Sequence, residues 1–499
     1  MNLLYDERFD GALPEIDKHG LLADLQRLLP SVAILHTNED LRPYECDGLS
    51  AYRTVPLLVV LPDTIDQVQA LLRYCHERRV PVVARGAGTG LSGGALPLAK
   101  GILLSLARFN RILEVNPQAC IARVQPGVRN LAISEAAAPH GLYYAPDPSS
   151  QIACSIGGNV AENAGGVHCL KYGLTVHNVL SVEIITIEGE RMTLGSRALD
   201  SAGLDLLALF VGSEGLLGIV VEVTVKLLPK PEVAKVLLAS FTDVRDAGRA
   251  VGAIIGAGVI PGGLEMMDNL AIRAAEDFIH AGYPVDAAAI LLCELDGSPD
   301  DVAADSKRVR EVMQQCGATE VRVARDENER RQFWAGRKAA FPAVGRISPD
   351  YYCMDGTIPK RALPQVLEQI EVWSREFGLR VANVFHAGDG NLHPLILFDA
   401  NQPGELDRAE QFGGKILELC VAVGGSITGE HGVGREKINQ MCAQFCEDEL
   451  TVFRAVKAAF DARGLLNPGK NIPTLARCAE FGAMHVHHGN LPHPELERF

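Results

Sequence analysis

Apolar and polar positions first fall into a regular pattern at residues 55–85. Residues 55–61 form a continuous apolar run of strand length. After it, apolar side chains recur on one face of a helix at Ile65, Val68, Leu71, Leu72 and Cys75. Thr64 precedes this helix and Gln67 follows three residues later, which is the spacing of an N-terminal capping box. Together with a second apolar run at 80–85, the pattern predicts a β–α–β unit that leads into a glycine-rich loop.

Short apolar runs separated by glycine-rich turns continue as far as residue 231. They predict strands at residues 102–106, 121–125, 182–188 and 219–228. The sequence Leu-Pro-Lys-Pro at 228–231 breaks regular structure, so it predicts a domain boundary. We therefore expect an N-terminal cap segment at residues 1–53 and a first domain at residues 54–231.

Longer strands and helices alternate after this boundary. The pattern predicts strands at residues 234–241, 287–295 and 319–324, and helices at 244–255 and 301–316. This alternation predicts an α+β domain at residues 232–472, with helices on one face of a sheet. The C-terminal segment 473–499 is rich in histidine, but its spacing matches no common ligand pattern, so we expect a surface tail or an interface segment.

Composition narrows the class of protein. The chain has 499 residues, of which 47% are hydrophobic and 22% charged, and this is typical of a folded chain of two or more domains. The formal net charge of -15 argues against nucleic acid as a partner. We expect a cytoplasmic protein without an export signal or a membrane span, for which docking at the inner face of the cell membrane stays open. The 12 cysteines are too dispersed for an iron–sulfur cluster or a structural zinc site.

A glycine-rich loop follows the second strand of the β–α–β unit. Gly88, Gly90 and Gly93 satisfy the G-x-G-x-x-G spacing, and backbone amides without a Cβ beside them can bind a pyrophosphate. A Rossmann unit needs a helix directly after these glycines, whereas Pro97 and Gly101 interrupt the chain before the next predicted strand. The loop therefore predicts a phosphate site other than an ordinary NAD site, with a plain turn between strands as the alternative.

Two more glycine-rich segments follow, at residues 156–166 and 212–219, and a rigid polar turn at 144–150 precedes the first. Segments with so few side chains are not expected to build a core, but their backbone amides can line a long polar ligand. Three such loops suit a ligand with several separated polar parts, which a dinucleotide is.

Histidine and acidic residues gather in two further polar segments. His386 and His393 stand on the two arms of a predicted hairpin with an Asp-Gly turn, and Glu430 and His431 lie in a glycine-rich segment at 424–434. One carboxylate and two imidazoles form a common divalent-metal set. The alternative is that both histidines are ordinary polar residues near a turn, because two histidines alone do not make a metal site.

The three glycine loops, in this order, resemble the FAD-binding domain of the vanillyl-alcohol-oxidase type, and the resemblance extends over nearly the whole chain. The sequence is most similar to the FAD-linked subunit of bacterial glycolate oxidase, with D-lactate and D-2-hydroxyglutarate dehydrogenases as more distant relatives. The resemblance implies an α+β fold, in which a vanillyl-alcohol-oxidase-type FAD-binding domain (PCMH type) precedes an α+β substrate domain of the FAD-linked oxidase C-terminal type.

The resemblance also implies which residues contact FAD. The segment 467–470 resembles the closing motif of the family, where the chain returns to the flavin. The implied contacts are Arg85, Gly86, Ala87, Gly88, Thr89, Gly90, Ser92, Gly93, Pro146, Asp147, Ser149, Gly157, Gly158, Asn159, Asn163, Gly165, Gly166, Glu214, Gly218, Ile219 and Asn467. Some relatives tether FAD through a histidine in the pyrophosphate loop. No histidine lies between Arg85 and Gly94, so we expect non-covalent FAD.

For the chemistry, the resemblance implies a divalent metal, with zinc as the expected ion, bound by His386, His393 and Glu430. It implies that His431 is the general base and that Arg337 grips the substrate carboxylate. An arginine on the polar side of the predicted helix 327–341 is ordinarily solvated or paired, which is the alternative. A 2-hydroxy acid can chelate one metal through its hydroxyl and carboxylate, and a neutral imidazole can take the hydroxyl proton while the C2 hydride passes to flavin N5.

The sequence therefore predicts an FAD-dependent dehydrogenase subunit that oxidises glycolate to glyoxylate, and also D-lactate, with an acceptor other than NAD or oxygen. Residues 394–396 (Pro-Leu-Ile) place few polar groups after His393, which favours a small monocarboxylate. The resemblance implies that electrons pass to partners, namely a second flavin-type subunit and an iron–sulfur subunit. The alternatives are a self-contained D-lactate or D-2-hydroxyglutarate dehydrogenase and a non-catalytic electron-relay flavoprotein.

Overall fold

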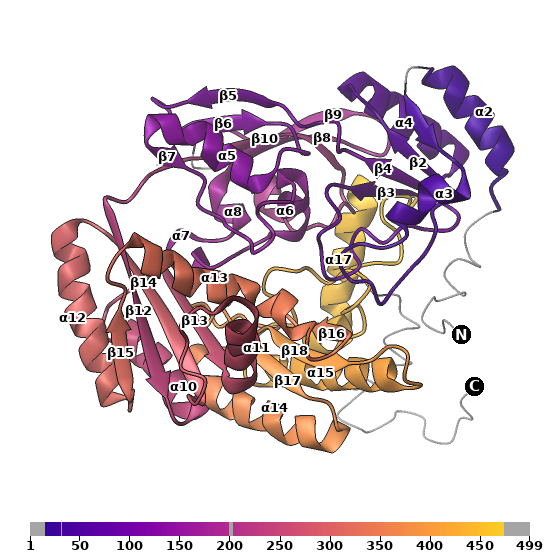
Figure 1. The fold of residues 1–499 in the computed structure, drawn as a ribbon. Coiled ribbons are helices and arrows are strands. Elements are labelled where there is room, and N and C mark those ends of the chain that lie inside the picture. Colours follow the sequence, from indigo (N-terminus) through magenta and orange to yellow (C-terminus); the bar gives the residue numbers. More distant parts are fainter. Residues whose placement is uncertain (1–14, 31, 199–202, 474–499) are drawn as a thin grey trace.

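The computed structural model describes residues 15–30, 32–198 and 203–473. These residues form two domains, one above the other in Figure 1, and the C-terminal helix lies beside both. The histidine-rich segment predicted as a tail lies outside the described residues from residue 474 onward.

The predicted β–α–β unit is confirmed and forms part of a four-stranded sheet. The strand order is β1 (Ala33–Leu35), β2 (Leu58–Leu61), β4 (Ile102–Ser105) and β3 (Val82–Arg85). β2 and β3 both run parallel to β4, and α4 (Ile65–Arg78) connects them. The capping box is present, because the Gln67 amide donates to Thr64 Oγ1 at 3.3 Å and the Thr64 amide donates to Gln67 Oε1 at 3.2 Å. Residues 86–101 hold no helix before β4, so the loop is not a Rossmann turn.

The other predicted strands of this domain form an antiparallel five-stranded sheet. Its order is β5 (Ile112–Asn116), β6 (Ile121–Val124), β10 (Ile219–Lys226), β8 (Val179–Ile185) and β9 (Arg191–Gly195). β11 (Leu228–Pro229) still pairs with β7 (Leu142–Tyr143), and the chain then enters the second domain. The short helices here are α2 (Lys18–Leu28), α3 (Asn38–Leu41), η1 (Arg42–Tyr44), α5 (Asn130–Ala137), η2 (Ala138–His140), α7 (Cys169–Tyr172), α8 (Thr175–Asn178) and α9 (Leu206–Phe210).

The expectation that the glycine-rich segment 156–166 builds no core is wrong for its first half. Ile156–Glu162 forms α6, which Ser155 caps. Ile156 and Val160 lie one helical turn apart and are fully buried in the core of the first domain. One face of this helix therefore packs in the core, and the other face carries almost no side chains. The number of glycines alone does not indicate this difference between the two faces.

The second domain is built on a seven-stranded sheet. Its order is β15 (Glu320–Val323), β12 (Val233–Phe241), β14 (Ala289–Gly297), β13 (Gly263–Asp268), β17 (Val381–Phe385), β18 (Pro394–Phe398) and β16 (Asp350–Cys353). The helices packed on it are α10 (Val244–Gly256), α11 (Asn269–Ile279), α12 (Pro299–Gln315), α13 (Glu327–Val344), η3 (Lys360–Ala362), α14 (Leu363–Phe377) and α15 (Glu405–Ala422).

The expectation of helices on one face of this sheet is wrong, because successive residues of β12 face two different cores. Leu237 and Ala239 pack with α10, α12, α14 and α15, whereas Val236 and Leu238 pack with α11 and α13. The sheet is therefore covered on both faces. β13 was not predicted, because Glu265 interrupts its apolar run.

The chain returns to the first domain after crossing the second. α16 (Met441–Gln444) and α17 (Glu447–Phe460, yellow in Figure 1) lead to Leu466, which pairs with Val82 of β3. The Asn467 amide donates to the Val82 carbonyl at 2.8 Å. Leu465 and Leu466 are buried in the core of the four-stranded sheet. Among the helices of the described residues, none is both long and apolar enough to cross a membrane.

Candidate active site

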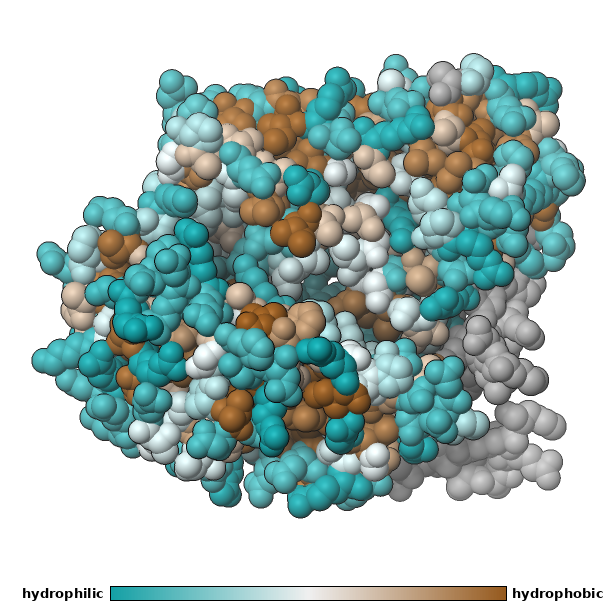
Figure 2. Space-filling view, viewed as in Figure 1, coloured by the Kyte–Doolittle hydropathy of each residue, from teal (hydrophilic) through white to brown (hydrophobic). Residues whose placement is uncertain are grey.

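A cavity of about 420 Å³ lies where the two domains meet. The space-filling view shows the surface hollowed between the upper and lower domains (Figure 2). The glycine loops of the first domain form most of the cavity wall. The second domain contributes Lys338, Phe341, Pro342, His393, Glu430 and His431. The volume falls in the range of small-molecule sites, roughly 300–1,000 Å³.

Most of the FAD contacts inferred from sequence line this cavity. They are Arg85, Gly86, Ala87, Gly88, Thr89, Gly90, Ser149, Gly157, Gly158, Asn159, Glu214, Gly218 and Ile219. The Arg85 guanidinium donates to the Cys46 carbonyl at 2.6 Å, so this side chain is held by the N-terminal segment. Gly88 has a φ of +71°, and a Cβ there would lie 2.6 Å from Arg85 Nε. Only glycine fits that position, and the loop presents mainly backbone to the cavity.

The other inferred contacts do not line the cavity, and some of them hold its walls in place instead. They are Ser92, Gly93, Pro146, Asp147, Asn163, Gly165, Gly166 and Asn467. The Ser92 carbonyl, for example, accepts from the Arg435 amide at 2.9 Å. Asn467 Nδ2 donates to the carbonyls of Gly94 at 3.0 Å and Glu214 at 2.6 Å. The physical reason is that polar groups in glycine-rich backbone need partners of their own when they are buried.

Glu214 lines the cavity and joins its wall to the second domain. Its Oε1 accepts from the Val433 amide at 2.7 Å and from Asn471 Nδ2 at 2.6 Å, and its Oε2 accepts from the Gly434 amide at 2.7 Å. Burial raises the pKa of Glu214, and these N–H donors oppose that rise. The carboxylate therefore fixes the backbone that immediately follows His431.

The structure brings the three inferred metal ligands together. β17 and β18 form the predicted hairpin, and His386 and His393 lie on its two arms. Glu430 Oε1 lies 3.2 Å from His386 Nε2 and 3.3 Å from His393 Nε2. The two imidazole rings stand nearly perpendicular, with centroids 4.9 Å apart. Two nitrogens and a carboxylate oxygen thus converge on one point of the domain boundary.

Glu265 of β13 orients this group from behind and was missed from sequence. It is 1% exposed, and His386 Nδ1 lies 2.8 Å from its Oε1. Arg337 Nε donates to Glu265 Oε2 at 2.7 Å. A carboxylate on the far nitrogen of a metal-binding histidine fixes the tautomer and the ring orientation. The pairing joins strands far apart in the sequence, so no local pattern could have revealed it.

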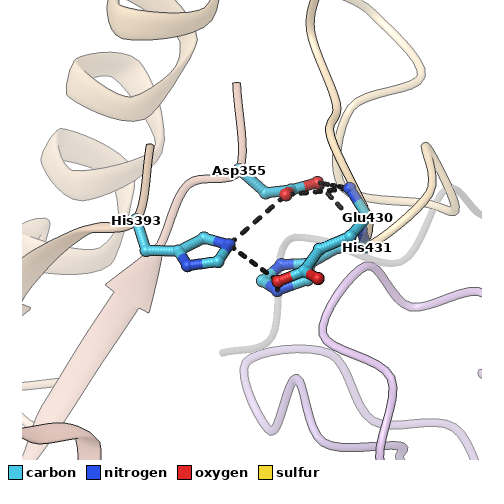
Figure 3. Close-up of side chains that lie close together, drawn as sticks. All are labelled: Asp355, His393, Glu430 and His431. Carbon is cyan, nitrogen blue, oxygen red and sulfur yellow. Dashed lines mark hydrogen bonds and ion pairs between the residues drawn. The ribbon is translucent and has the colours of Figure 1, made fainter. Parts of the chain in front are cut away.

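Asp355 is a second residue that sequence reasoning missed. Figure 3 shows its carboxylate facing His393 and the backbone of the segment that carries Glu430 and His431. Its oxygens accept from the amides of His431 at 2.9 Å and Glu430 at 3.1 Å, and from Lys437 Nζ at 3.0 Å. Burial opposes ionisation of Asp355, but His431, Lys437 and His393 around it hold its pKa well below the usual value. The anion therefore organises the turn that presents both side chains to the cavity.

His431 lines the cavity beside the inferred ligands. Its ring stacks on His393 with centroids 4.9 Å apart and an interplanar angle of 7°. Its Nδ1 finds no hydrogen-bond partner among the residues that the structure describes. Burial lowers the pKa of His431 to about 4, so this imidazole is neutral near pH 7 and can accept a proton.

Arg337 lies behind the cavity wall instead of in it. The side chain is 2% exposed and is paired with Glu265, whereas the next residue, Lys338, lines the cavity. Arg337 Nη2 is 2.7 Å from Glu265 Oε2, yet it makes no hydrogen bond within the described part of the chain. Residues 394–396 belong to β18 and do not line the cavity. The apolar wall near the histidines comes instead from Phe341 and Pro342.

His168 joins the two domains beside the cavity. Its Nδ1 lies 2.8 Å from Asp147 Oδ2 of the first domain, and its Nε2 lies 3.1 Å from Glu294 Oε1 of β14. Burial disfavours the charged ring, but Asp147 and Glu294 outweigh it and hold the pKa of His168 well above its usual value. A charged imidazole between two carboxylates therefore holds the domains together at neutral pH.

Comparison with known proteins assigns both domains to described families. Residues 56–195 match a family described as FAD binding domain, and residues 230–471 match FAD linked oxidases, C-terminal domain. The chain is 74% identical over 499 residues, all of both chains, to glycolate oxidase subunit GlcD of Escherichia coli K12. It is 39% identical over 435 residues to the Bacillus subtilis protein of the same name, covering 87% of this chain and 93% of that one.

More distant comparisons extend the family and confirm the fold. The chain is 31% identical over 443 residues to a D-lactate dehydrogenase of Anaerostipes hadrus, covering 87% of this chain and 92% of that one. A solved structure of p-cresol methylhydroxylase superposes with a TM-score of 0.79 at 17% identity, over 93% of this chain and 99% of that one. The two-domain α+β fold of the vanillyl-alcohol-oxidase type is therefore confirmed. The chain belongs to the family of FAD-linked oxidases that includes the glycolate oxidase subunit GlcD.

Proposed function

We propose that this chain is the FAD-bearing subunit that oxidises glycolate to glyoxylate, and also accepts D-lactate. One observation carries the proposal: Glu430 lies between His386 and His393, with His431 beside them, at the end of a cavity walled by glycine loops. The identity of 74% to a glycolate oxidase subunit supports glycolate as the substrate.

The residues of the cavity fit FAD. Its glycine-rich wall exposes backbone amides, which suit a pyrophosphate, and its far end carries the imidazoles that a substrate needs. FAD, when bound, accepts the hydride of the substrate at N5. We propose that FAD is held without a covalent bond, because residues 85–94 contain no histidine. Acid precipitation should then release all flavin into the supernatant, and yellow colour retained in the pellet would contradict this.

The donor set also fits a divalent metal, which we assign to His386, His393 and Glu430. Asp355, His393, Glu430 and His431 form an overlapping group whose ligand atoms lie within 4.8 Å of one another. We prefer the first set, because Asp355 already accepts from several N–H groups while Glu265 holds His386 in the orientation of a ligand. Two imidazoles and one carboxylate suit zinc. A bound metal acidifies the substrate hydroxyl and fixes its position.

In the reaction that we propose, His431 takes the proton of the substrate hydroxyl, and the hydride on C2 leaves toward the flavin. His431 suits this role because it is neutral and its Nδ1 is free of other bonds among the described residues. We assign the substrate carboxylate to Arg337, whose Nη2 pairs with Glu265 Oε2 at 2.7 Å but makes no hydrogen bond among the described residues. Phe341 and Pro342 make the wall near the histidines apolar, which suits a small monocarboxylate.

We further propose that the electrons leave through partners, a second flavin-type subunit and an iron–sulfur subunit. The names of the relatives in E. coli and B. subtilis describe a subunit. Within the described residues, the side chains grouped closely enough to hold a metal include no cysteine. We assign the iron–sulfur carrier to another chain. Complex assembly at the inner face of the membrane would deliver these electrons to a membrane acceptor.

The alternative is a self-contained D-lactate dehydrogenase, which the identity of 31% to such an enzyme keeps open. The deciding experiment measures flavin reduction in the isolated chain with a panel of 2-hydroxy acids, and then turnover with and without partners pulled down from the host. The proposal expects glycolate to give the highest kcat/KM and an iron–sulfur protein to be recovered with the chain. Preference for D-lactate, with full turnover by the chain alone, would overturn it.

A further inference from the structure

Glu162 is an acidic residue in the cavity wall for which the proposed reaction gives no role. It is the last residue of α6 and follows the glycine face of that helix. A Cβ added at Gly94 would lie 2.5 Å from Glu162 Oε1, and one at Gly432 would overlap Glu162 Oε2. The carboxyl group is therefore enclosed between the pyrophosphate loop and the turn that directly follows His431.

Glu162 and Glu214 share this space but differ in their hydrogen bonds. The Cβ considered at Gly432 would also lie 3.0 Å from Glu214 Oε1, so the two carboxyl groups are neighbours. Glu214 accepts from three N–H groups. Glu162 Oε2 is enclosed and has no donor among the described residues. Of two carboxyl groups in one enclosed site, the one without donors keeps the proton.

The cations near Glu162 are already committed to other acceptors. Lys437 Nζ donates to Asp355 and to the Gly432 carbonyl, at 3.0 and 2.9 Å. Lys470 Nζ donates to the Leu96 carbonyl and to Asn467 Oδ1. The remaining charged groups that face Glu162 are the carboxylates Glu214 and Asp47. Burial raises the pKa of Glu162 well above its usual value, both carboxylates raise it further, and Lys437 and Lys470 offset this rise only in part.

We propose that Glu162 is a protonated carboxylic acid that donates a hydrogen bond to the flavin ring of bound FAD. The position favours the ring over the rest of the cofactor, because Glu162 lies against Gly432, the residue after His431, and we place the substrate beside His431. Ring carbonyl oxygens and ring nitrogens are the acceptors there. A neutral acid also avoids repulsion with the negative charge of the cofactor and with Glu214.

The proposal rests on FAD occupying this cavity, but not on the identity of the substrate. The test is a reduced-minus-oxidised infrared difference spectrum of the FAD-loaded protein, in which the flavin is reduced electrochemically. Substrate oxidation is not needed, so failure of the proposed function and failure of this proposal are distinguishable. We expect the carbonyl stretch of a protonated carboxyl group that shifts on flavin reduction and again in D₂O.

Three variants assign this band. Glu162→Gln should remove it and keep FAD affinity within about threefold, because the amide is a neutral donor of similar shape. Glu162→Asp should move its frequency, and this variant serves if the glutamine variant does not fold. Glu77→Gln, an exposed site in α4, should leave the band unchanged. Absence of the band in the wild-type protein would overturn the proposal. So would a band that both Glu162 variants leave in place, or FAD binding more than about tenfold tighter in Glu162→Gln, which would mean that a negative charge had been removed.

Discussion

The carboxylate of Asp355 accepts a hydrogen bond from the backbone amide of His431 at 2.9 Å. The same carboxylate lies 3.4 Å from His393 Nε2, so it contacts both the hairpin and the glycine-rich segment 424–434. The two segments that carry the inferred base and the inferred ligands are therefore set relative to one another by an anion that does not line the cavity.

Replacing Asp355 should disorganise the site without removing any group that we assign to the chemistry. Asp355→Asn should lower metal affinity and the rate of flavin reduction by about 10–100-fold, the span typical of residues that orient metal ligands. Metal titration followed by stopped-flow reduction with glycolate measures both. Asp407→Asn, an exposed site on α15, is the matched control. Unchanged metal affinity in Asp355→Asn would show that the turn holds its shape without this carboxylate.

Replacing His431 should affect proton transfer while leaving FAD in place. His431→Asn should slow flavin reduction by roughly 100-fold or more, which is the usual contribution of a general base. FAD content, read from absorbance, should stay at the wild-type level, because the glycine loops that line the cavity are untouched. The exposed His140 offers the control variant His140→Asn. An unaltered reduction rate in His431→Asn would remove this residue from the mechanism.

Removing the metal should stop substrate oxidation but not cofactor binding. A chelator is expected to abolish flavin reduction by glycolate, and zinc should restore it, while the flavin spectrum persists. Glu265→Gln should make the protein lose metal at about 10–100-fold lower chelator concentration, because Glu265 holds His386 in place. A preparation that is free of metal and fully active would exclude the metal site.

Arg337 and Lys338 are adjacent, so they can be compared directly as the cation for the substrate carboxylate. Arg337→Ala should raise KM for glycolate by about tenfold or more with a smaller change in kcat, since a charged hydrogen bond to a carboxylate contributes about 1.5–3 kcal/mol. Lys338→Ala should have little effect. The opposite result would be a raised KM in Lys338→Ala and an unchanged KM in Arg337→Ala. It would contradict the assignment and move the role to Lys338, which lines the cavity whereas Arg337 does not.

The bridge at His168 should make stability depend on pH. The pKa of His168 is raised in the folded state, so its proton-linked stabilisation is complete below the unfolded pKa of about 6.5 and is lost as pH rises through the folded value. His168→Gln should therefore lower the free energy of unfolding by about 1–2 kcal/mol at pH 6, and by less at pH 9. Denaturant titrations at both pH values measure this, with His140→Gln as control. A deficit that is equal or larger at pH 9 would rule out the charged bridge.

The parts of the site that sequence predicts well are those built by local spacing. The Thr64–Gln67 capping box, the Arg85–Gly94 loop and the hairpin that carries His386 and His393 each depend on a few neighbouring residues. Asp355 and Glu265 could not be found this way. Each is a single acid in an apolar strand or its end, and its role follows from partners more than 70 residues away in the chain.

The burial of Arg337 also could not be predicted from local sequence. Its residue type and its helix position suit an exposed or paired side chain equally well, and only the packing of α13 on β13 decides that it is buried against Glu265.

The expectation that the glycine-rich segment 156–166 builds no core was wrong for a different reason. Its composition records how many side chains are missing but not on which face of α6 they are missing, so the buried pair Ile156 and Val160 went unnoticed.

The return of the chain to β3 has a consequence for engineering. Because Leu466 pairs with Val82 and is buried with the four-stranded sheet, the last described residues complete the first domain after the second has been traversed. A chimera that exchanges substrate domains between relatives by a single crossover near residue 231 would bring a foreign segment into that sheet. Two crossovers, one near residue 231 and one between α17 and Leu466, would keep each domain with its own chain. The second domain is thus an insertion within the first, and an exchange has to cut the chain on both sides of it.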